Sequence, residues 1–120
     1  MAEARSHRDL IVWQKAMDLT VLVYKHCKRF PPYETYGLDS QLTRAAASVP
    51  ANIAEGNGRG AVKDYARFLG IAKGSLMETE TYLNLAVRLE YLLEDDIAEA
   101  MGLIVEISKM LTAMRAKLQI

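Results

Sequence analysis

Apolar residues recur every three or four positions along most of this 120-residue chain, and this spacing is what most constrains its fold. Such a spacing places residues on one face of an α-helix, whereas a half-buried strand requires strict alternation. The longest run, which predicts a long helix after Gly60, contains Tyr65, Phe68, Leu69, Ala72, Leu76, Thr79, Leu83, Ala86 and Leu89. No segment shows a competing strand pattern.

Three further runs predict three more helices. The first starts at Asp9 as its N-cap, ends at Pro31 and buries one face, made of Leu10, Trp13, Met17, Thr20, Tyr24, Cys27 and Phe30. The second is capped by Asp39 or Ser40, and its buried residues are Leu42, Ala46, Val49 and Ile53. The fourth buries Ile97, Met101, Ile104, Ser108, Leu111 and Leu118. Four helices with short connections predict an all-α, antiparallel, up-down-up-down four-helix bundle, formed by residues 9–120 as one domain after a flexible N-terminus of residues 1–8.

The predicted second helix, within Leu38–Gly60, carries unusual residues. Pro50 lies in its interior, where a proline removes one backbone hydrogen bond and costs about 3 kcal/mol, so a kink or two short helices are expected. Residues 56–60 (GNGRG) are expected to form a helix-terminating turn. In the third helix, Gly70 and Gly74 predict close packing by a neighbouring helix.

Charge and composition favour self-association over a strong field. Lys and Arg balance Asp and Glu at 15 each, although residues 1–73 carry a net charge of +4 and residues 74–120 a net charge of −4. The hydrophobic fraction of 51% exceeds the need of one small core, so apolar surface is expected to be covered by partner copies. One cysteine and no apolar run of about 18 residues predict a cytoplasmic protein without a membrane span.

Residue patterns for catalysis and for metal or cofactor binding are missing from the sequence. The glycine-rich segment 56–60 lacks the Lys-Ser/Thr that follows in a phosphate-binding loop. His7 and His26 lie on different segments, and no Glu-x-x-His pair of a di-metal bundle occurs. Cys27 falls on the predicted buried face of the first helix. We therefore expect no enzymatic activity and no cofactor.

A line of polar residues, Ser48, Asn52 and Glu55, follows one side of the predicted second helix. If this line is buried, its groups need hydrogen-bonding partners, for which Ser75, Glu78 and Arg67, from the third helix or from a neighbouring chain, are candidates. The line then fixes helix register or a subunit interface. A solvated edge explains the same pattern equally well.

Basic residues provide the one pattern that suggests a ligand. Arg59, Lys63 and Arg67 repeat every four residues, Lys73 follows further along the third helix, and Arg44 is expected nearby. Like charges at this spacing repel one another, and a nucleic-acid backbone would relieve the repulsion. A solvated helix face is the competing interpretation.

Three segments, DLIVWQKAMDL, YGLDSQLTRAAASVPANIAEGNGR and YARFLGIAKGSLMETETYL, resemble a family of four-helix bundles associated with intervening sequences in bacterial 23S ribosomal RNA genes. The accessory variability protein of diversity-generating retroelements is similar to this family. The resemblance spans residues 9–93 and is most specific in SVPANIAEG. It implies a ring-like homopentamer that binds structured RNA, or a ribonucleoprotein such as a reverse transcriptase complex. The alternative is a protein-directed adaptor that docks through Val12, Leu19 and Leu22, which lie off the predicted buried face of the first helix.

Overall fold

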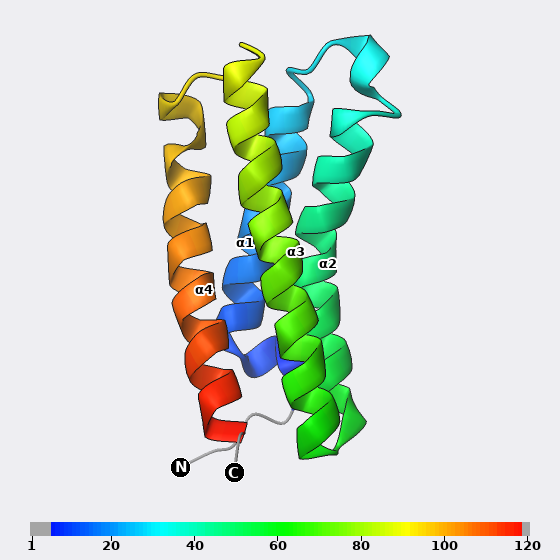
Figure 1. Cartoon of the computed structure of the whole chain (residues 1–120), viewed down its shortest axis with the longest axis vertical. Coiled ribbons are helices and arrows are strands. Elements are labelled where there is room, and N and C mark those ends of the chain that lie inside the picture. The colour runs from blue at the N-terminus through cyan, green and yellow to red at the C-terminus, as the bar shows by residue number, and fades with distance from the viewer. Residues whose placement is uncertain (1–5, 119–120) are drawn as a thin grey trace.

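The chain forms a bundle of four long helices in a computed structural model that describes residues 6–118. The helices are α1 (Ile11–Cys27), α2 (Leu38–Arg59), α3 (Val62–Arg88) and α4 (Ala98–Leu118). Three short 3₁₀ turns accompany them, at His7–Asp9 (η1), Pro32–Glu34 (η2) and Asp95–Ile97 (η3). Helices that follow one another in sequence run in opposite directions (Figure 1). The predicted antiparallel up-down-up-down bundle is confirmed.

The start of the chain differs from the prediction. Residues 1–5 of the predicted flexible segment lie outside the described residues. Ser6 is already structured, because its hydroxyl accepts a hydrogen bond from the Arg8 backbone N–H at 3.2 Å and so caps η1. Asp9 belongs to η1, and the N-cap of α1 is Leu10, which provides no side-chain cap.

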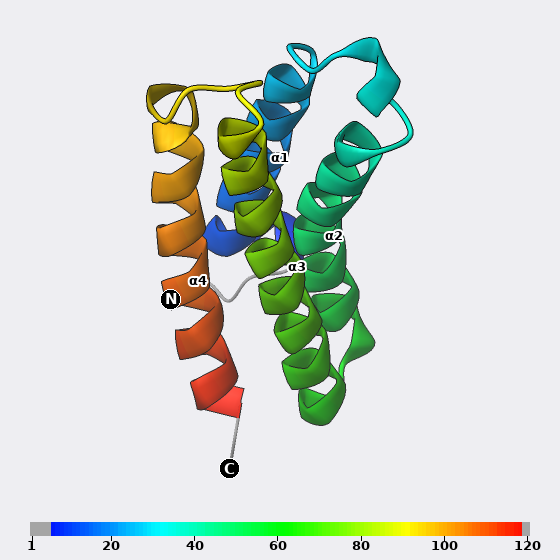
Figure 2. The same cartoon turned by 45° about the horizontal axis from the view of Figure 1, so that its top comes forward.

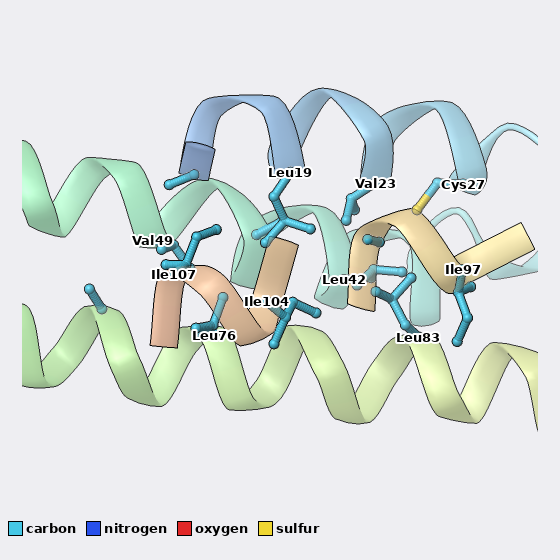
Figure 3. Close-up of a cluster of buried hydrophobic side chains, with 14 of the residues drawn as sticks. Leu19, Val23, Cys27, Leu42, Val49, Leu76, Leu83, Ile97, Ile104 and Ile107 are labelled. Carbon is cyan, nitrogen blue, oxygen red and sulfur yellow. The ribbon is translucent and has the colours of Figure 1, made fainter. Parts of the chain in front are cut away.

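Helix α1 turns a different face to the core than the spacing predicted. Its buried residues are Val12, Ala16, Leu19, Val23 and Cys27, whereas Met17 is 40% exposed and Tyr24 is 52% exposed. Figure 3 shows Leu19 and Val23 among the side chains that converge between the helices. The prediction is confirmed for Cys27 and Phe30, which are buried, and wrong for Met17 and Tyr24. Because α1 is apolar on two sides with the same spacing, only its neighbours decide which side is covered.

The predicted core of α2 is confirmed, since Leu42, Ala46, Val49 and Ile53 are all fully buried. The prediction of two short helices is wrong, because α2 is one helix with Pro50 inside it. Pro50 leaves the Ala46 carbonyl without its usual N–H donor four residues later. The Thr20 hydroxyl of α1 lies 3.1 Å from this oxygen and donates to it, while it also lies 2.8 Å from the Ala16 carbonyl. A side chain of the neighbouring helix thus helps to satisfy the gap in α2.

Helices α2 and α3 form the most extensive helix contact in the bundle. A Cβ added at Gly56 would lie 2.8 Å from the Phe68 Cβ, so the glycine allows the two helices to approach closely. The predicted turn at residues 56–60 is shorter than expected, because α2 continues to Arg59 and only Gly60, with φ of 81°, has left the helix. Close packing holds for Gly70, which contacts the Arg115 side chain of α4, but not for Gly74, where a Cβ would meet nothing within 4 Å.

Polar contacts join the α1–α2 and α3–α4 connections, which lie together at the top of the bundle (Figure 2). The Tyr91 hydroxyl donates to Glu34 at 2.8 Å, and Glu34 also accepts from the Leu38 backbone N–H at 3.0 Å. Arg29 pairs with Asp96 at 2.9 Å. These contacts hold the two connections together. The α2–α3 turn lies at the opposite end of the bundle.

Candidate nucleic-acid interface

Charge is separated along the long axis of the bundle. If each helix is cut at its midpoint, the half with the α2–α3 turn consists of residues 6–18, 49–75 and 108–118. This half, which we call the basic half, holds nine Lys or Arg and four Asp or Glu, a net charge of +5. The other half, residues 19–48 and 76–107, holds five Lys or Arg and ten Asp or Glu, a net charge of −5. The antiparallel arrangement gathers the C-terminal ends of α2 and α4 with the N-terminal end of α3 (Figure 1). A chain without net charge therefore presents one basic end.

The structure brings Arg59 and Arg67 of the predicted basic stripe together over one aromatic ring. The Arg59 guanidinium carbon lies 5.1 Å from the centre of the Phe68 ring, and that of Arg67 lies 4.4 Å from it. Both distances are typical of cation–π contacts, which hold the guanidinium groups flat against the surface. Arg59 also pairs with Glu55 at 3.6 Å, whereas Lys63 is exposed and forms no ion pair with the described residues.

Lys73 and Arg44 lie apart from these arginines. Lys73 faces α4, where its ammonium group donates to the Thr112 hydroxyl at 2.8 Å. Arg44 lies fifteen residues before Arg59 on α2, roughly 22 Å along the helix axis. It contacts the Ser40 hydroxyl at 3.4 Å in the acidic half of the bundle. The expectation that Arg44 lies near the stripe is therefore wrong.

The basic half contains further cations that the sequence analysis did not assign to the stripe: Arg8, Lys15, Lys109, Arg115 and Lys117. Of these, Lys15 pairs with Glu106. Arg115 and Lys117 lie in the last turn of α4, where the helix dipole alone is a sufficient reason for basic residues. The predicted topology could have located Arg115 and Lys117, since an antiparallel bundle places the C-terminal end of α4 beside the N-terminal end of α3.

Two members of the predicted polar line form a hydrogen-bonded cluster with α3. The Ser48 and Ser75 hydroxyls lie 2.9 Å apart, and the Asn52 amide donates to the Ser48 carbonyl at 2.8 Å and to the Ser48 hydroxyl at 2.9 Å. Ser75 is buried, so this cluster fixes the register of α2 against α3. Glu55 lies outside it, with an exposed side chain that pairs with Arg59.

A shallow groove of about 270 Å³ lies beside the cluster, between the acidic-half parts of α2 and α3. Glu78 lines it opposite Arg44 but makes no hydrogen bond or ion pair with a described residue, so it is not a partner of the polar line. The groove residues are Gln41, Arg44, Ala45, Ser48, Ser75, Glu78 and Tyr82.

The groups most often used for catalysis or metal binding are arranged for packing. Burial, with a smaller contribution from Asp39, raises the pKa of the Cys27 thiol to about 12, so the reactive thiolate is suppressed. Burial also lowers the pKa of His26. Among residues 6–118, no cluster of three or more His, Cys, Asp or Glu could hold a metal ion. None of the described helices is long and apolar enough to cross a membrane.

Comparison with known proteins identifies the family. Residues 8–113 match the family described as 23S rRNA-intervening sequence protein. The chain belongs to this family. The resemblance seen in its sequence motifs is thereby confirmed. No curated protein matches the chain significantly.

A solved structure has a fold similar to that of this chain. It is the crystal structure of a protein of unknown function from the S23 ribosomal protein family of Bacteroides thetaiotaomicron VPI-5482. The two chains are 25% identical, with a TM-score of 0.80, and the match covers 88% of this chain and 98% of the other. The bundle is thus similar over most of its length to a protein whose function is described as unknown.

Proposed function

We propose that this intervening-sequence protein is a non-enzymatic, homo-oligomeric scaffold that contacts structured RNA or a ribonucleoprotein in the cytoplasm. The observation that carries the proposal is the basic half, with its net charge of +5. Arg59, Lys63, Arg67 and Lys73 would contact phosphates. A phosphate backbone suits this end because it neutralises several cations at once and releases their counterions.

Unpaired cations support the RNA contact. Within residues 6–118, carboxylates pair with only two cations of the basic half, Lys15 and Arg59. Arg67 and Lys63 are exposed and have no carboxylate partner among the described residues. The contacts with the Phe68 ring restrict the Arg59 and Arg67 side chains before RNA binds, so less side-chain entropy is lost on binding.

An uncovered apolar face of α1 supports self-association into the proposed homopentamer. This outer face consists of Trp13, Met17, Val21 and Tyr24, of which the last three are 40%, 52% and 52% exposed. Beside it lies an apolar groove of about 330 Å³, lined by Trp13, Met17, Thr20, Ala47, Pro50, Ala51 and Ala54. A surface of this kind is typical of subunit interfaces. The adaptor alternative cannot use Val12 and Leu19, because both are buried in the core.

A titration of labelled structured RNA tests the nucleic-acid contact. We expect saturable binding that weakens as salt rises, and a lower affinity with a salt slope reduced by roughly two in Lys63→Glu/Arg67→Glu. The matched control is Lys25→Glu/Lys28→Glu, which makes the same charge change at exposed residues of the acidic half. Fluorescence anisotropy at two salt concentrations measures both quantities. Equal losses in the two double variants, or no binding at low salt, would contradict the RNA contact.

A further inference from the structure

Two pairs of residues contact each other between α3 and α4, within the basic half. A Cβ added at Gly70 would lie 3.3 Å from the Arg115 guanidinium, so Arg115 lies directly over Gly70. The Lys73 ammonium contacts the Thr112 hydroxyl at 2.8 Å. Gly70 and Lys73 are three residues apart on α3, and Thr112 and Arg115 are three apart on α4. The two contacts are therefore one helical turn apart along the α3–α4 interface. Residues at this spacing have Cβ atoms about 5–6 Å apart.

The two cations of these contacts, Arg115 and Lys73, have no carboxylate among the described residues to balance them. Neither Arg115 nor Lys73 pairs with a carboxylate of the described residues, and the buried Arg115 Nε makes no hydrogen bond with them. An arginine in such a position keeps most of its five N–H donors available. Two positive charges one helical turn apart repel each other. An anion between them would attract both and make the net electrostatic energy favourable.

The groups around the two cations match a tetrahedral oxyanion. The Arg115 guanidinium presents a planar fork of donors, the Lys73 ammonium acts as a point charge, and the Thr112 hydroxyl is free to donate because it accepts from Lys73. Gly70 and Gly74 place no side chain of their own beside Lys73, and a Cβ added at Gly74 would meet nothing within 4 Å. A phosphate group could therefore approach from solvent and contact all three side chains.

We propose that Lys73, Thr112 and Arg115 form a seat for a single phosphate group, with Gly70 as the position that lets the guanidinium lie flat. The phosphate comes from an RNA backbone if the RNA contact proposed above holds, and otherwise from a free phosphate or a phosphorylated small molecule. The seat itself rests only on the two contacts between α3 and α4. It is separate from Arg59 and Arg67, which lie on the Phe68 ring.

Inorganic phosphate is the first probe, titrated against chloride at equal ionic strength and followed by the backbone amide signals of the ¹⁵N-labelled protein. We expect saturable shifts centred on residues 70–74 and 112–115. Arg115→Gln should weaken binding about tenfold or more, since a hydrogen bond to a charged group is lost, and Thr112→Val should weaken it less. Lys25→Gln, in the acidic half, should leave the affinity unchanged.

A pair of glycine variants separates the seat from general charge effects. Gly70→Ala adds a methyl group that displaces the Arg115 guanidinium, so it should weaken phosphate binding without any change of charge. Gly102→Ala makes the same change inside α4, where a Cβ would meet nothing within 4 Å, and should keep the affinity. Both variants exchange a helical glycine for alanine, which favours folding, and circular dichroism verifies the helix content.

Structured RNA as a second probe identifies the source of the phosphate. RNA that shifts the same amides and competes with phosphate assigns the seat to the RNA backbone. Phosphate binding at the seat without any effect of RNA assigns it to a free phosphate or phosphorylated small molecule. The absence of saturable phosphate shifts, or affinity that survives in both Arg115→Gln and Gly70→Ala, overturns the seat. RNA binding at Lys63 and Arg67 would still stand in that case, so the two proposals fail separately.

Discussion

Glu90 has an uncommon backbone conformation. It follows α3 with φ of 66°, and it is the one non-glycine residue with positive φ in the part of the chain that the structure describes. The Tyr91 N–H bonds the Ala86 carbonyl and the Glu90 N–H bonds the Val87 carbonyl, each at 2.9 Å. These two bonds are those of the Schellman motif, in which glycine usually occupies the position of Glu90. The C-terminal end of α3 is therefore formed despite its residue type.

Replacing this glutamate should stabilise the protein. We expect Glu90→Gly to raise the free energy of unfolding by about 1 kcal/mol, because glycine adopts positive φ without a Cβ penalty. For a domain of this size the melting temperature would rise by about 4 °C. Glu90→Gln is the control, since it removes the charge but keeps the Cβ, and it should give no comparable gain. Thermal melts followed by circular dichroism decide; an equal gain in both variants would point to charge instead.

Two carboxylates at the same end make folding sensitive to acid. The Leu93 N–H, then the Arg29 guanidinium, hold the pKa of Asp96 below its usual range, and the Leu38 N–H, then the Tyr91 hydroxyl, do so for Glu34. A lowered pKa in the folded state contributes stability that is present above the unfolded-state pKa of roughly 4 and is lost as the pH falls through the folded-state value.

Asp96→Asn and Glu34→Gln should therefore reduce the acid dependence of folding. The melting temperature of the natural protein should fall between about pH 5 and pH 3, and each variant should start lower at pH 7 and fall less over this interval. Glu94→Gln serves as the control, because its side chain is exposed and makes no hydrogen bond with a described residue. A fall as steep as that of the natural protein in both variants would show that these contacts do not contribute.

Helix α2 shows how a neighbouring element supports a residue that its own helix disfavours. Pro50 is buried inside α2, and the nearest support for the carbonyl that it leaves unpaired comes from Thr20 of α1. The hydroxyl has one proton for two acceptors, the Ala16 and Ala46 carbonyls, and the Ala46 carbonyl is the one with no helical N–H available. Helix α2 therefore depends on α1 for its continuity as well as for its apolar cover.

A double-mutant cycle measures this dependence. We expect Thr20→Val to lower the free energy of unfolding by about 1–3 kcal/mol, because a part-buried carbonyl loses its donor. In the Pro50→Ala background the loss should be clearly smaller, since the new N–H at position 50 can bond the Ala46 carbonyl. Urea unfolding of the four proteins provides the coupling energy. Equal losses in both backgrounds would mean that Thr20 acts only through packing or through Ala16.

At the scale of the whole molecule, the bundle has two surfaces that no part of the described chain covers, one basic and one apolar. Its basic half carries a net charge of +5, and the outer face of α1 leaves Met17, Val21 and Tyr24 about half exposed. The two surfaces are compatible in the proposed ring, because copies related by rotation about one axis would have their basic ends on the same side. Each added copy would enlarge the basic surface.

The outer face of α1 should control the mass of the assembly. We expect light scattering at micromolar concentration to give about five times the 13.4 kDa mass of one chain. Met17→Glu/Val21→Glu should yield monomers with unchanged helix content, because a charge buried in an interface costs several kcal/mol while both sites are exposed in the single chain. Val105→Glu, at a residue of α4 that is 50% exposed, should leave the mass unchanged. A monomeric natural protein would contradict the proposed oligomer.

The part of the candidate site that lies on one helix segment could be predicted from the sequence. Arg59, Lys63 and Arg67 follow from helical spacing alone, and Ser75 was among the partners expected for Ser48. Arg44 was misplaced, because spacing along one helix does not give the register against the next. Within one chain, Glu55 lies at an exposed edge, as the alternative interpretation predicted, and Glu78 does not join the polar line. Arg115 became a candidate only when α4 was placed beside α3, where Gly70 makes room for it.

The sequence by itself determined the helices, their order and the family, because helix formation follows from spacing, caps and breakers within a few residues of each position. Only the tertiary structure decided which apolar side of α1 is buried. The set Val12, Ala16, Leu19 and Val23 has the same helical spacing as Trp13, Met17, Thr20 and Tyr24, so contact with the other helices alone chooses between them. The place of the charges was also a tertiary result, since the sequence segments with net charges of +4 and −4 lie side by side in the bundle, whereas antiparallel packing collects cations from four helices at one end.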